Sequence, residues 1–446
     1  MKRVIIIGGS VSGVTCALTL IANDKNLDIT IIESSSYIAK QTSSAQSLIS
    51  KQCELSQTFF TTKQIVEEQN IKILLKTCII SINQEAKLIA TNDCNLPYDY
   101  LVIATGTKNT HTFDSQRFIP FNTVEGLQKL QNFEQQSVAI IGGGISGVEI
   151  ASAFAERKVK TLLITDKEKL CTSNFDIEFS NQIEKLLKIN KVEVVLNQKV
   201  TKIVDVQNHV EIITTKEKYE VDCYINCTGI TPNVDFLKDI VKRNDEGAII
   251  VDKTQCTSVP KIYAIGDCAT VYSNLIKQDI FAPSAQLASK SAISCACTIL
   301  GKPLPMQGTQ NTKCLNLFGY YFCATGNPLH ILSAPSAKRV KISDNHRAEF
   351  MPSFEVVSMQ LTYDEESRAI YGSQIFSKHD ISSYINALSL AIQRNLKIEQ
   401  MLVMDFFFQP YFGKPWHMIN LACMATIGLP PFEQYKIRNE GQEEIQ

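Results

Sequence analysis

The sequence contains no Cys-x-x-Cys pair, although fourteen of its 446 residues are cysteine. The closest spacings are Cys295-Ala-Cys297, in a segment with helical character, and Cys223-x-x-x-Cys227, in the strand-like VDCYINCTG. Residues i and i+2 of a helix face apart, so the first spacing does not suit a shared metal or a disulfide. We therefore expect buried free thiols rather than a disulfide framework.

Long apolar runs and an excess of charge of one sign are also missing. No stretch reaches the roughly 18 apolar residues of a membrane-spanning helix. The apolar run in MKRVIIIGG is short and is followed by GGSVSG, so we predict no secretory signal. The formal net charge of −1 does not favour capture of nucleic acid or of an anionic membrane. We expect a cytoplasmic protein with neither partner.

Histidine is sparse, with six residues in the chain. No two of them have the spacing of metal ligands, and we predict no metal site.

The first informative segment runs from Arg3 to Glu33. RVIIIGG predicts a buried strand, GGSVSG a glycine turn, VTCALTLIAN a helix and LDITIIE a second strand. Gly8 permits the tight turn, and Gly13 permits close packing of helix on strand. The helix N-terminus then offers N–H groups and a positive dipole end to a pyrophosphate. Glu33 stands where a carboxylate would bind ribose hydroxyls.

Two other residues of this first turn are expected to contact the cofactor. Ser10 replaces the middle glycine of the usual pattern, and Val11 follows it. We also expect a cofactor contact from Ile79.

A second unit of the same kind follows in SVAIIGGGISGVEIASAFAE. Its turn has the full G-x-G-x-x-G form, with Gly142, Gly144 and Gly147, and we expect Ile145 to face the cofactor. The next strand, KTLLIT, ends at Thr165, and Asp166 follows as the candidate ribose acid. An acid favours a free 2′-hydroxyl, whereas the nearby Lys167 and Lys169 would favour a 2′-phosphate. We expect NADH to be preferred over NADPH.

The two turns lie 134 residues apart, from Gly8 to Gly142. One chain with two dinucleotide sites is most simply a flavoprotein that binds FAD in one unit and NAD(P)H in the other. Three further segments support this prediction: YDYLVIATGTKN, YINCTGITPN and KIYAIGDCAT. Their expected cofactor-binding residues are Thr105, Gly106, Gly229, Gly266 and Asp267, and the carboxylate of Asp267 suits the hydroxyls of a ribityl chain.

The ordered set GGSVSG, Glu33, ATGT, GGGISG, INCTGITPN and AIGDCA resembles the FAD-dependent pyridine nucleotide–disulfide oxidoreductases. The subgroup it is most similar to comprises NADH oxidase, NADH peroxidase and coenzyme A disulfide reductase. The tail segments GTQNTKCLNLFGYYFCATGN and DFFFQPYFGKPWHM resemble that family's dimerisation domain.

The resemblance implies an α/β fold with two Rossmann-like dinucleotide-binding domains and a C-terminal α+β dimerisation domain. The implied boundaries are 1–112 with 253–306 for FAD, 113–252 for NAD(P)H and 307–446 for dimerisation. It also implies a homodimer in which the partner's C-terminal domain approaches each flavin.

The chain departs from the family where the redox-active cysteine is expected, about ten residues beyond the ribose acid. Counting from Glu33 leads to Ser43, with Ser44 beside it. Cys53 lies in SAQSLISKQCELS, for which we predict a helix and a packing role. Two further family residues are replaced, the histidine of the first turn by Val11 and the tyrosine of the DxxY segment by Phe408.

Three features of the site each suit more than one role. Glu149 matches a family carboxylate near the flavin. A carboxylate early in a helix is also stabilised by the helix dipole, so Glu149 suits a purely structural role as well. For His417, packing or surface exposure is favoured over a place facing the partner's flavin. Six aromatic residues close to it could cover the flavin at the subunit interface, although ordinary core packing is favoured for most of them: Phe406, Phe407, Phe408, Tyr411, Phe412 and Trp416.

A serine hydroxyl cannot form a mixed disulfide or a sulfenic acid, whereas reduction of a flavin by NAD(P)H needs no thiol. We therefore predict an NADH oxidase-like enzyme that passes electrons to oxygen, with hydrogen peroxide as product, or to another small acceptor. The alternatives are a disulfide or coenzyme A disulfide reductase that uses Cys53, and a flavin- and NADH-binding protein with little turnover.

Overall fold

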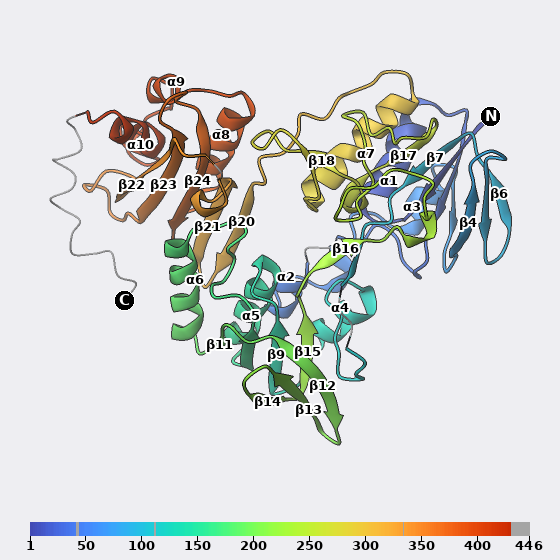
Figure 1. Ribbon diagram of the computed structural model, residues 1–446, viewed down its shortest axis with the longest axis horizontal. Helices are drawn as coiled ribbons and strands as arrows, with labels where there is room; N and C mark the ends of the chain where they lie inside the picture. Colours follow the sequence, from blue (N-terminus) through green and yellow to red (C-terminus); the bar gives the residue numbers. More distant parts are fainter. Residues whose placement is uncertain (42–43, 111–112, 333, 430–446) are drawn as a thin grey trace.

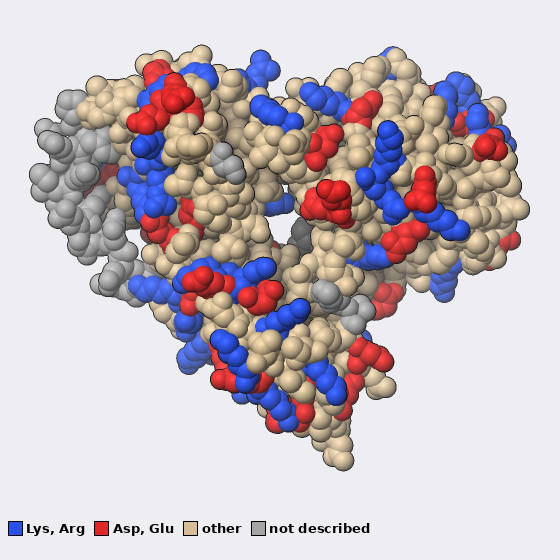
Figure 2. Space-filling model, viewed as in Figure 1, with Lys and Arg blue, Asp and Glu red and all other residues tan. Residues whose placement is uncertain are grey.

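The computed structural model describes residues 1–41, 44–110, 113–332 and 334–429. They form three lobes, each built on its own main sheet (Figure 1). Figure 2 shows a hollow where the three lobes meet, and charges of both signs are interspersed over the visible face.

The first lobe is built on a parallel five-stranded sheet. Its strands, in spatial order, are β17 (Ile262–Ala264), β7 (Tyr100–Ile103), β1 (Lys2–Ile7), β2 (Leu27–Ile32) and β3 (Ile71–Leu74). Figure 1 shows segments from the two ends of this unit, blue and yellow, lying side by side.

Both faces of this sheet are covered. Val4 and Ile6 of β1 pack with α1 (Val11–Asn23) and α7 (Ala285–Ile299). Ile5 and Ile7 point to the opposite face. There they share a core with an antiparallel sheet of β4 (Ile79–Asn83), β5 (Leu88–Thr91) and β6 (Asn95–Pro97). This explains why RVIIIGG is apolar without alternation. The short α3 (Lys63–Glu67) precedes β3.

The second lobe repeats this plan. Its parallel sheet consists of β11 (Glu193–Val195), β10 (Lys160–Ile164), β9 (Ser137–Ile141) and β15 (Cys223–Asn226). One face packs with helices, which are α2 (Ala45–Ile49), α4 (Val124–Gln131), α5 (Ile145–Glu156) and α6 (Ile177–Ile189). The other face packs with an antiparallel sheet of β12 (Val200–Val206), β13 (His209–Thr214) and β14 (Lys218–Val221).

The third lobe is an antiparallel five-stranded sheet. Its strands, in spatial order, are β20 (Lys313–Leu317), β21 (Tyr320–Gly326), β24 (Ile370–Ser377), β23 (Val356–Asp364) and β22 (Ala337–Asn345). It shares a core with α8 (Ser382–Gln393), α9 (Ile398–Leu402) and α10 (Met418–Thr426).

The chain crosses between the first two lobes on a two-stranded antiparallel ribbon of β8 (Thr107–Asn109) and β16 (Ile230–Pro232). Beyond it, Val234, Leu237 and Val251 are already part of the first lobe's core. The domain boundaries stay a prediction, but this packing favours a return to the first lobe near residue 232 rather than 253. The two-stranded pair β18 (Val271–Tyr272) and β19 (Asp279–Ile280) precedes α7.

Most of the expected elements are confirmed, and one is wrong. The predicted helix around Cys53 ends at Ile49, and Cys53 lies in the bend that follows α2. Its half-buried side chain packs against the core of the second lobe. Among the described residues, no helix has both the length and the apolar character needed to cross a membrane.

A buried carboxylate joins the second lobe to the third. Asp176 precedes α6, and its side chain is only 5% exposed. Its Oδ2 accepts hydrogen bonds from Gln374 Nε2 at 2.8 Å and Gln360 Nε2 at 2.5 Å, and His330 Nδ1 lies 3.1 Å from Oδ1. Hydrogen bonds to a buried charged group are among the strongest in proteins, so this contact fixes α6 on the sheet of the third lobe.

We expect the Asp176→Ala variant to lower the free energy of unfolding by ~3 kcal/mol, because two amide groups lose their acceptor inside a dry contact. The nearby Glu178 pairs with Arg339 and Lys341 at the exposed rim, and Glu178→Ala is the matched control, with a loss under ~1 kcal/mol. Urea denaturation followed by circular dichroism measures both. Equal losses in the two variants would contradict the assignment.

Candidate functional site

The two glycine turns place helix on strand at very short range. A Cβ on Gly13 would lie 1.8 Å from the carbonyl oxygen of Gly8, and one on Gly147 would lie 2.0 Å from that of Gly142. Neither position can therefore hold any residue other than glycine without moving the helix. The two turns therefore have the same helix-on-strand packing, as the sequence predicts.

The helix N-termini that follow these turns have no side-chain caps. The N-cap residues are Ser10 for α1 and Gly144 for α5, and neither helix has an acidic residue in its first turn. Among the residues that the structure describes, no side chain caps either helix. Val11 and Ile145 are the first residues of the two helices. A Cβ on Gly144 would meet no atom within 4 Å. Uncapped N–H groups beside open space fit the phosphates of a dinucleotide.

Glu33 follows β2 directly, as predicted, and is held by the first turn. Its Oε2 accepts a hydrogen bond from the Gly9 N–H at 2.8 Å, and its Oε1 accepts one from Ser35 N at 2.7 Å. The Ser10 hydroxyl donates to the carbonyl of Lys40 at 2.9 Å, which ties the next loop to the turn. The carboxylate is therefore oriented before any ligand binds.

Lys40 is a residue that the sequence analysis missed. Burial lowers the pKa of its ammonium to about 8, although Glu33 and Glu125 act in the opposite direction. Its Nζ donates to the carbonyl of Asn122. Nothing in the sequence marks this lysine, because its proximity to Glu33 depends on the path of the loop after β2.

The equivalent acid of the second unit is more exposed. Asp166 comes one residue after the buried Thr165, and its carboxylate lies 3.8 Å from Lys167 Nζ. Lys169 is turned toward α6, where its Nζ lies 3.7 Å from Glu184 Oε2. Of the two lysines, only Lys167 is therefore placed beside the candidate ribose acid.

The ends of strands β7 and β17 lie side by side, because the two strands are paired in parallel register. Thr105 and Gly106 follow β7, and Gly266 and Asp267 follow β17. A Cβ on Gly106 would again meet no atom within 4 Å. The corresponding position of the second unit, Gly229, precedes β16. The predicted residues of the first unit thus share one edge of the sheet, where ligands of such sheets bind.

Asp267 has a cationic neighbour that the sequence analysis also missed. Burial raises the pKa of its carboxyl, while a hydrogen bond from Ser284 N at 2.9 Å and the charge of Lys313 oppose this shift. Lys313 begins β20 of the third lobe and donates to the carbonyl of Pro283 at 3.2 Å. Burial in turn lowers the pKa of Lys313. The third lobe therefore contributes a charge to the FAD side of the site.

Ile79, in contrast, lies at the start of β4 and packs on the core of the first lobe. Its predicted contact with a cofactor stays a prediction.

Glu149 lies in the second turn of α5, as predicted, and its carboxyl is largely buried. Burial raises the pKa of this group to about 7. Both protonation states are therefore populated near neutral pH, as is typical of carboxyls that take part in catalysis. A charged Glu149 also helps to raise the pKa of Cys171, whose thiol is mainly affected by its complete burial.

The position of the missing cysteine falls partly outside the described residues. Ser43 is not among them, whereas Ser44 precedes α2 and donates a hydrogen bond to the carbonyl of Gln41 at 3.1 Å. α2 itself packs into the core of the second lobe through Leu48 and Ile49. The chain between Glu33 and α2 therefore leads from the first lobe to the second. A redox-active residue in this part of the chain would lie close to both lobes.

The C-terminal aromatic residues differ from the sequence prediction. Core packing holds for Phe406, which stacks on His417 with ring centroids 4.5 Å apart. His417 also caps α10 and is packed as predicted, and burial lowers its pKa to about 4. For the other five aromatic residues the prediction is wrong, because they are exposed: Phe407, Phe408, Tyr411, Phe412 and Trp416. Their pattern gives no period that would separate a core from an interface.

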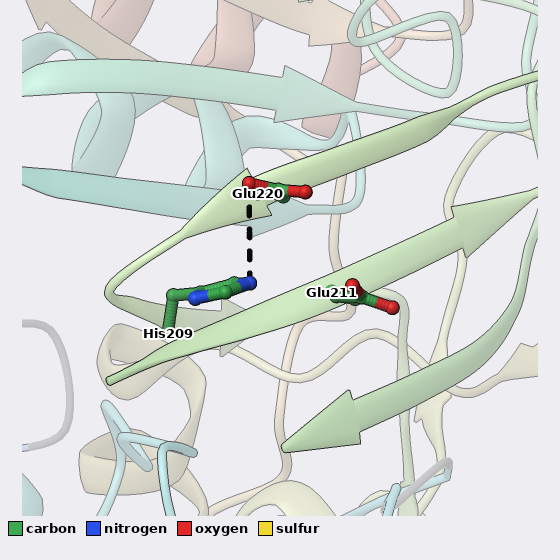
Figure 3. Close-up of side chains that lie close together, drawn as sticks. All are labelled: His209, Glu211 and Glu220. Carbon is green, nitrogen blue, oxygen red and sulfur yellow. Dashed lines mark ion pairs between the residues drawn. The ribbon is translucent and has the colours of Figure 1, made fainter. Parts of the chain in front are cut away.

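One cluster of possible metal ligands lies on the outer hairpin of the second lobe, away from both glycine turns. His209, Glu211 and Glu220 each offer an atom within 4.8 Å of the others (Figure 3). Lys218 forms ion pairs with both carboxylates, so a cation of the chain already lies between them. We assign these four side chains to an ion-pair network.

Comparison with known proteins places the chain in a family. Residues 2–291 match the pyridine nucleotide-disulphide oxidoreductase model, and residues 333–418 match that family's dimerisation domain. The NADH oxidase of Enterococcus faecalis is 28% identical over 95% of this chain and 99% of its own. That of Lactococcus lactis is 29% identical over 95% and 99%.

A solved structure gives the same result. The water-forming NADH oxidase from Lactobacillus brevis, bound to NADH, is 26% identical and superimposes with a TM-score of 0.92 over 96% of this chain and 98% of its own. The predicted fold class and the predicted family are both confirmed. The two uncapped glycine turns, the carboxylates beside them and the antiparallel third lobe belong together: this chain is a member of the pyridine nucleotide-disulphide oxidoreductase family.

Proposed function

We propose that the protein is an FAD-dependent NAD(P)H oxidase that passes electrons from a nicotinamide to oxygen. The observation that carries this proposal is the pair of uncapped glycine turns, each followed by an acid, in one chain. The similarity to NADH oxidases over nearly the whole chain supports it. When bound, FAD supplies the hydride acceptor and the electron donor to oxygen.

The chain's own residues would hold the two cofactors in fixed places. The N-terminus of α1, Glu33 and the edge formed by Gly106 and Asp267 suit FAD, because they belong to one sheet. The N-terminus of α5 and Asp166 suit NADH. Lys167 beside Asp166 reduces the discrimination against NADPH without reversing it.

Glu149 is the residue that we propose to act on the hydride step. A nicotinamide ring gains positive charge as it gives up hydride, and a carboxylate in a poorly solvated site stabilises that charge. The raised pKa of Glu149 makes this charge depend on pH near neutrality.

The acceptor follows from the residues after Glu33. The sequence offers Ser43 and Ser44 where the family has its redox cysteine, and Cys53 is half-buried against the second lobe. Without a thiol, two electrons reach oxygen and the product is hydrogen peroxide. The alternative, a disulfide reductase, requires Cys53 to reach the flavin, and its packing does not favour this.

We also propose a homodimer formed through the third lobe. Residues 403–416, the aromatic tail segment, expose seven large apolar side chains: Val403, Met404, Phe407, Phe408, Tyr411, Phe412 and Trp416. So many exposed apolar side chains in one short segment favour an interaction site. It lies in the part of the chain that matches the dimerisation domain, which makes a second copy the fitting partner. The cytoplasmic location expected from the sequence is proposed with it.

The Glu149→Gln variant tests the hydride step. In the unmodified protein the carboxyl is neutral below pH 7 and ionised above it, because its pKa is raised to about 7. We expect the rate of anaerobic flavin reduction by NADH to rise as pH increases through 7, and to stay about tenfold lower and flat in the variant. Stopped-flow absorbance measures it. Glu156→Gln, at the other end of α5, is the control, and a variant with an unchanged pH profile would remove Glu149 from the mechanism.

The product of oxygen reduction tests the role of the serines. We expect about one hydrogen peroxide per NADH oxidised, since no thiol shares in the reaction. Turnover is expected to persist after iodoacetamide treatment and in the Cys53→Ser variant. A peroxidase-coupled assay and oxygen electrode measure the ratio. Water as the sole product, together with loss of turnover in Cys53→Ser, would favour the thiol-dependent alternative.

The double variant Phe407→Glu, Phe412→Glu tests the dimer. These rings are 73% and 65% exposed, and their centroids lie 5.9 Å apart. Placing charges in an apolar contact is expected to weaken association by ~2 kcal/mol or more per site. Light scattering after gel filtration measures the mass. Ile80→Glu is the control, because Ile80 lies on β4 of the first lobe and is 64% exposed. A monomeric unmodified protein, or a dimer in the double variant, would contradict the interface.

A further inference from the structure

Two cysteines of the third lobe face each other across neighbouring strands. Cys314 of β20 and Cys323 of β21 are direct partners in the antiparallel register. The two strands are joined by a two-residue turn, Phe318-Gly319, in which both residues have positive φ. Such a turn fixes the register of a hairpin, so the facing of the two thiols is built into the fold.

The position in the hairpin brings the two Cα atoms close. Leu317 and Tyr320 flank the turn as register partners. In a hairpin with a two-residue turn the flanking pair is the hydrogen-bonded kind, and the two kinds of pair then alternate along the ladder. Three steps further, the alternation makes Cys314 and Cys323 a non-hydrogen-bonded pair, for which the Cα separation is about 4.5 Å. Disulfides span Cα separations of roughly 4.4–6.8 Å, so a bond can form without moving the backbone.

The two thiols differ in access and in acidity. β20 is the edge strand of the sheet, and Cys314 is exposed, whereas Cys323 is buried in the core that contains α8. A hydrogen bond from the Cys323 thiol lowers the pKa of Cys314 and correspondingly raises that of Cys323. Burial and the charge of Asp380 oppose the shift at Cys314. An exposed cysteine with a lowered pKa, next to a buried partner, is typical of a peroxide-reactive cysteine with its resolving cysteine.

We infer that Cys314 and Cys323 form a peroxide-reactive dithiol, oxidised reversibly to a disulfide within one chain. The Cys314 thiolate attacks one oxygen of hydrogen peroxide, an S–O bond forms as the O–O bond breaks, and the hydroxide released takes up the thiol proton as water. Cys323 sulfur then attacks Cys314 sulfur, an S–S bond forms as the S–O bond breaks, and the departing hydroxide takes up the Cys323 thiol proton and leaves as a second water. Two thiols lose two electrons, and one hydrogen peroxide becomes two waters.

The pair lies beside the FAD side of the site. Lys313, the residue before Cys314, donates a hydrogen bond to the carbonyl of Pro283, and its charge lowers the pKa of Asp267. The carbonyl of Asn316 accepts a hydrogen bond from Gln46 Nε2 at 2.9 Å. A disulfide would therefore tie the edge strand that carries these contacts to the interior of the sheet. The reaction does not depend on the proposed function, because the peroxide can come from any source.

Peroxide titration of the full-length, FAD-loaded protein tests this inference. After each addition, free thiols are blocked with N-ethylmaleimide and peptides are mapped without reduction. We expect the free thiols of Cys314 and Cys323 to be lost together and a peptide cross-linked between them to appear, at lower doses than oxidation of Cys78 and Cys94, which are also exposed. Dithiothreitol should restore both thiols, and a non-reducing gel should show a single-chain band.

Three variants separate the roles. Cys323→Ser should leave a sulfenic acid on Cys314 that dimedone traps, and Cys314→Ser should leave Cys323 reduced because it is buried. The matched control Cys94→Ser should keep the disulfide. A Cys314 that still reacts with N-ethylmaleimide after Cys78 and Cys94 are oxidised would overturn the inference, as would a bond between two chains.

Discussion

The structure depends on two places where a helix touches the strand before it. At Gly13 and Gly147 the helix backbone lies so close to the preceding turn that no side chain fits. This contact sets the axis of each helix relative to its sheet, and therefore the direction in which its free N–H groups point. The acids after the neighbouring strands, Glu33 and Asp166, stand at the ends of strands paired in parallel with the first. Two dinucleotide sites follow from one repeated packing constraint.

Burial shifts the pKa values of several charged groups near these sites. Glu149, Lys40, Lys313 and Asp267 all have pKa values displaced from their usual range, and burial is the largest cause in each case. Displacement toward neutrality by loss of solvent is a common property of functional sites. Two of the four come from segments that a nucleotide-binding motif does not include, so the site is assembled from more of the chain than its glycine turns.

The sequence predicted the motifs well and the long-range neighbours poorly. Gly8, Gly142 and Glu33 were placed correctly because strand, turn, helix and strand are local and each has a distinct period. The approach of Lys313 to Asp267 joins segments from different lobes, and no local pattern encodes it. Core packing was wrongly favoured over an interface for Phe407 and Phe412 for a related reason: an aromatic run has the same composition whether a core or a second chain covers it. The helix at Cys53 was predicted too long, since its first turn alone carries the apolar contacts of Leu48 and Ile49.

The ribbon of β8 and β16 has a mechanical consequence. The second lobe enters and leaves the first through these two paired strands, and Asp176 anchors its far side to the third lobe. The second lobe is also held by packing, because α2 and side chains of β20 and β21 belong to its core. A lobe attached by the ribbon, by α2 and by the third lobe does not turn freely about the ribbon, so packing sets the position of α5 relative to the first lobe.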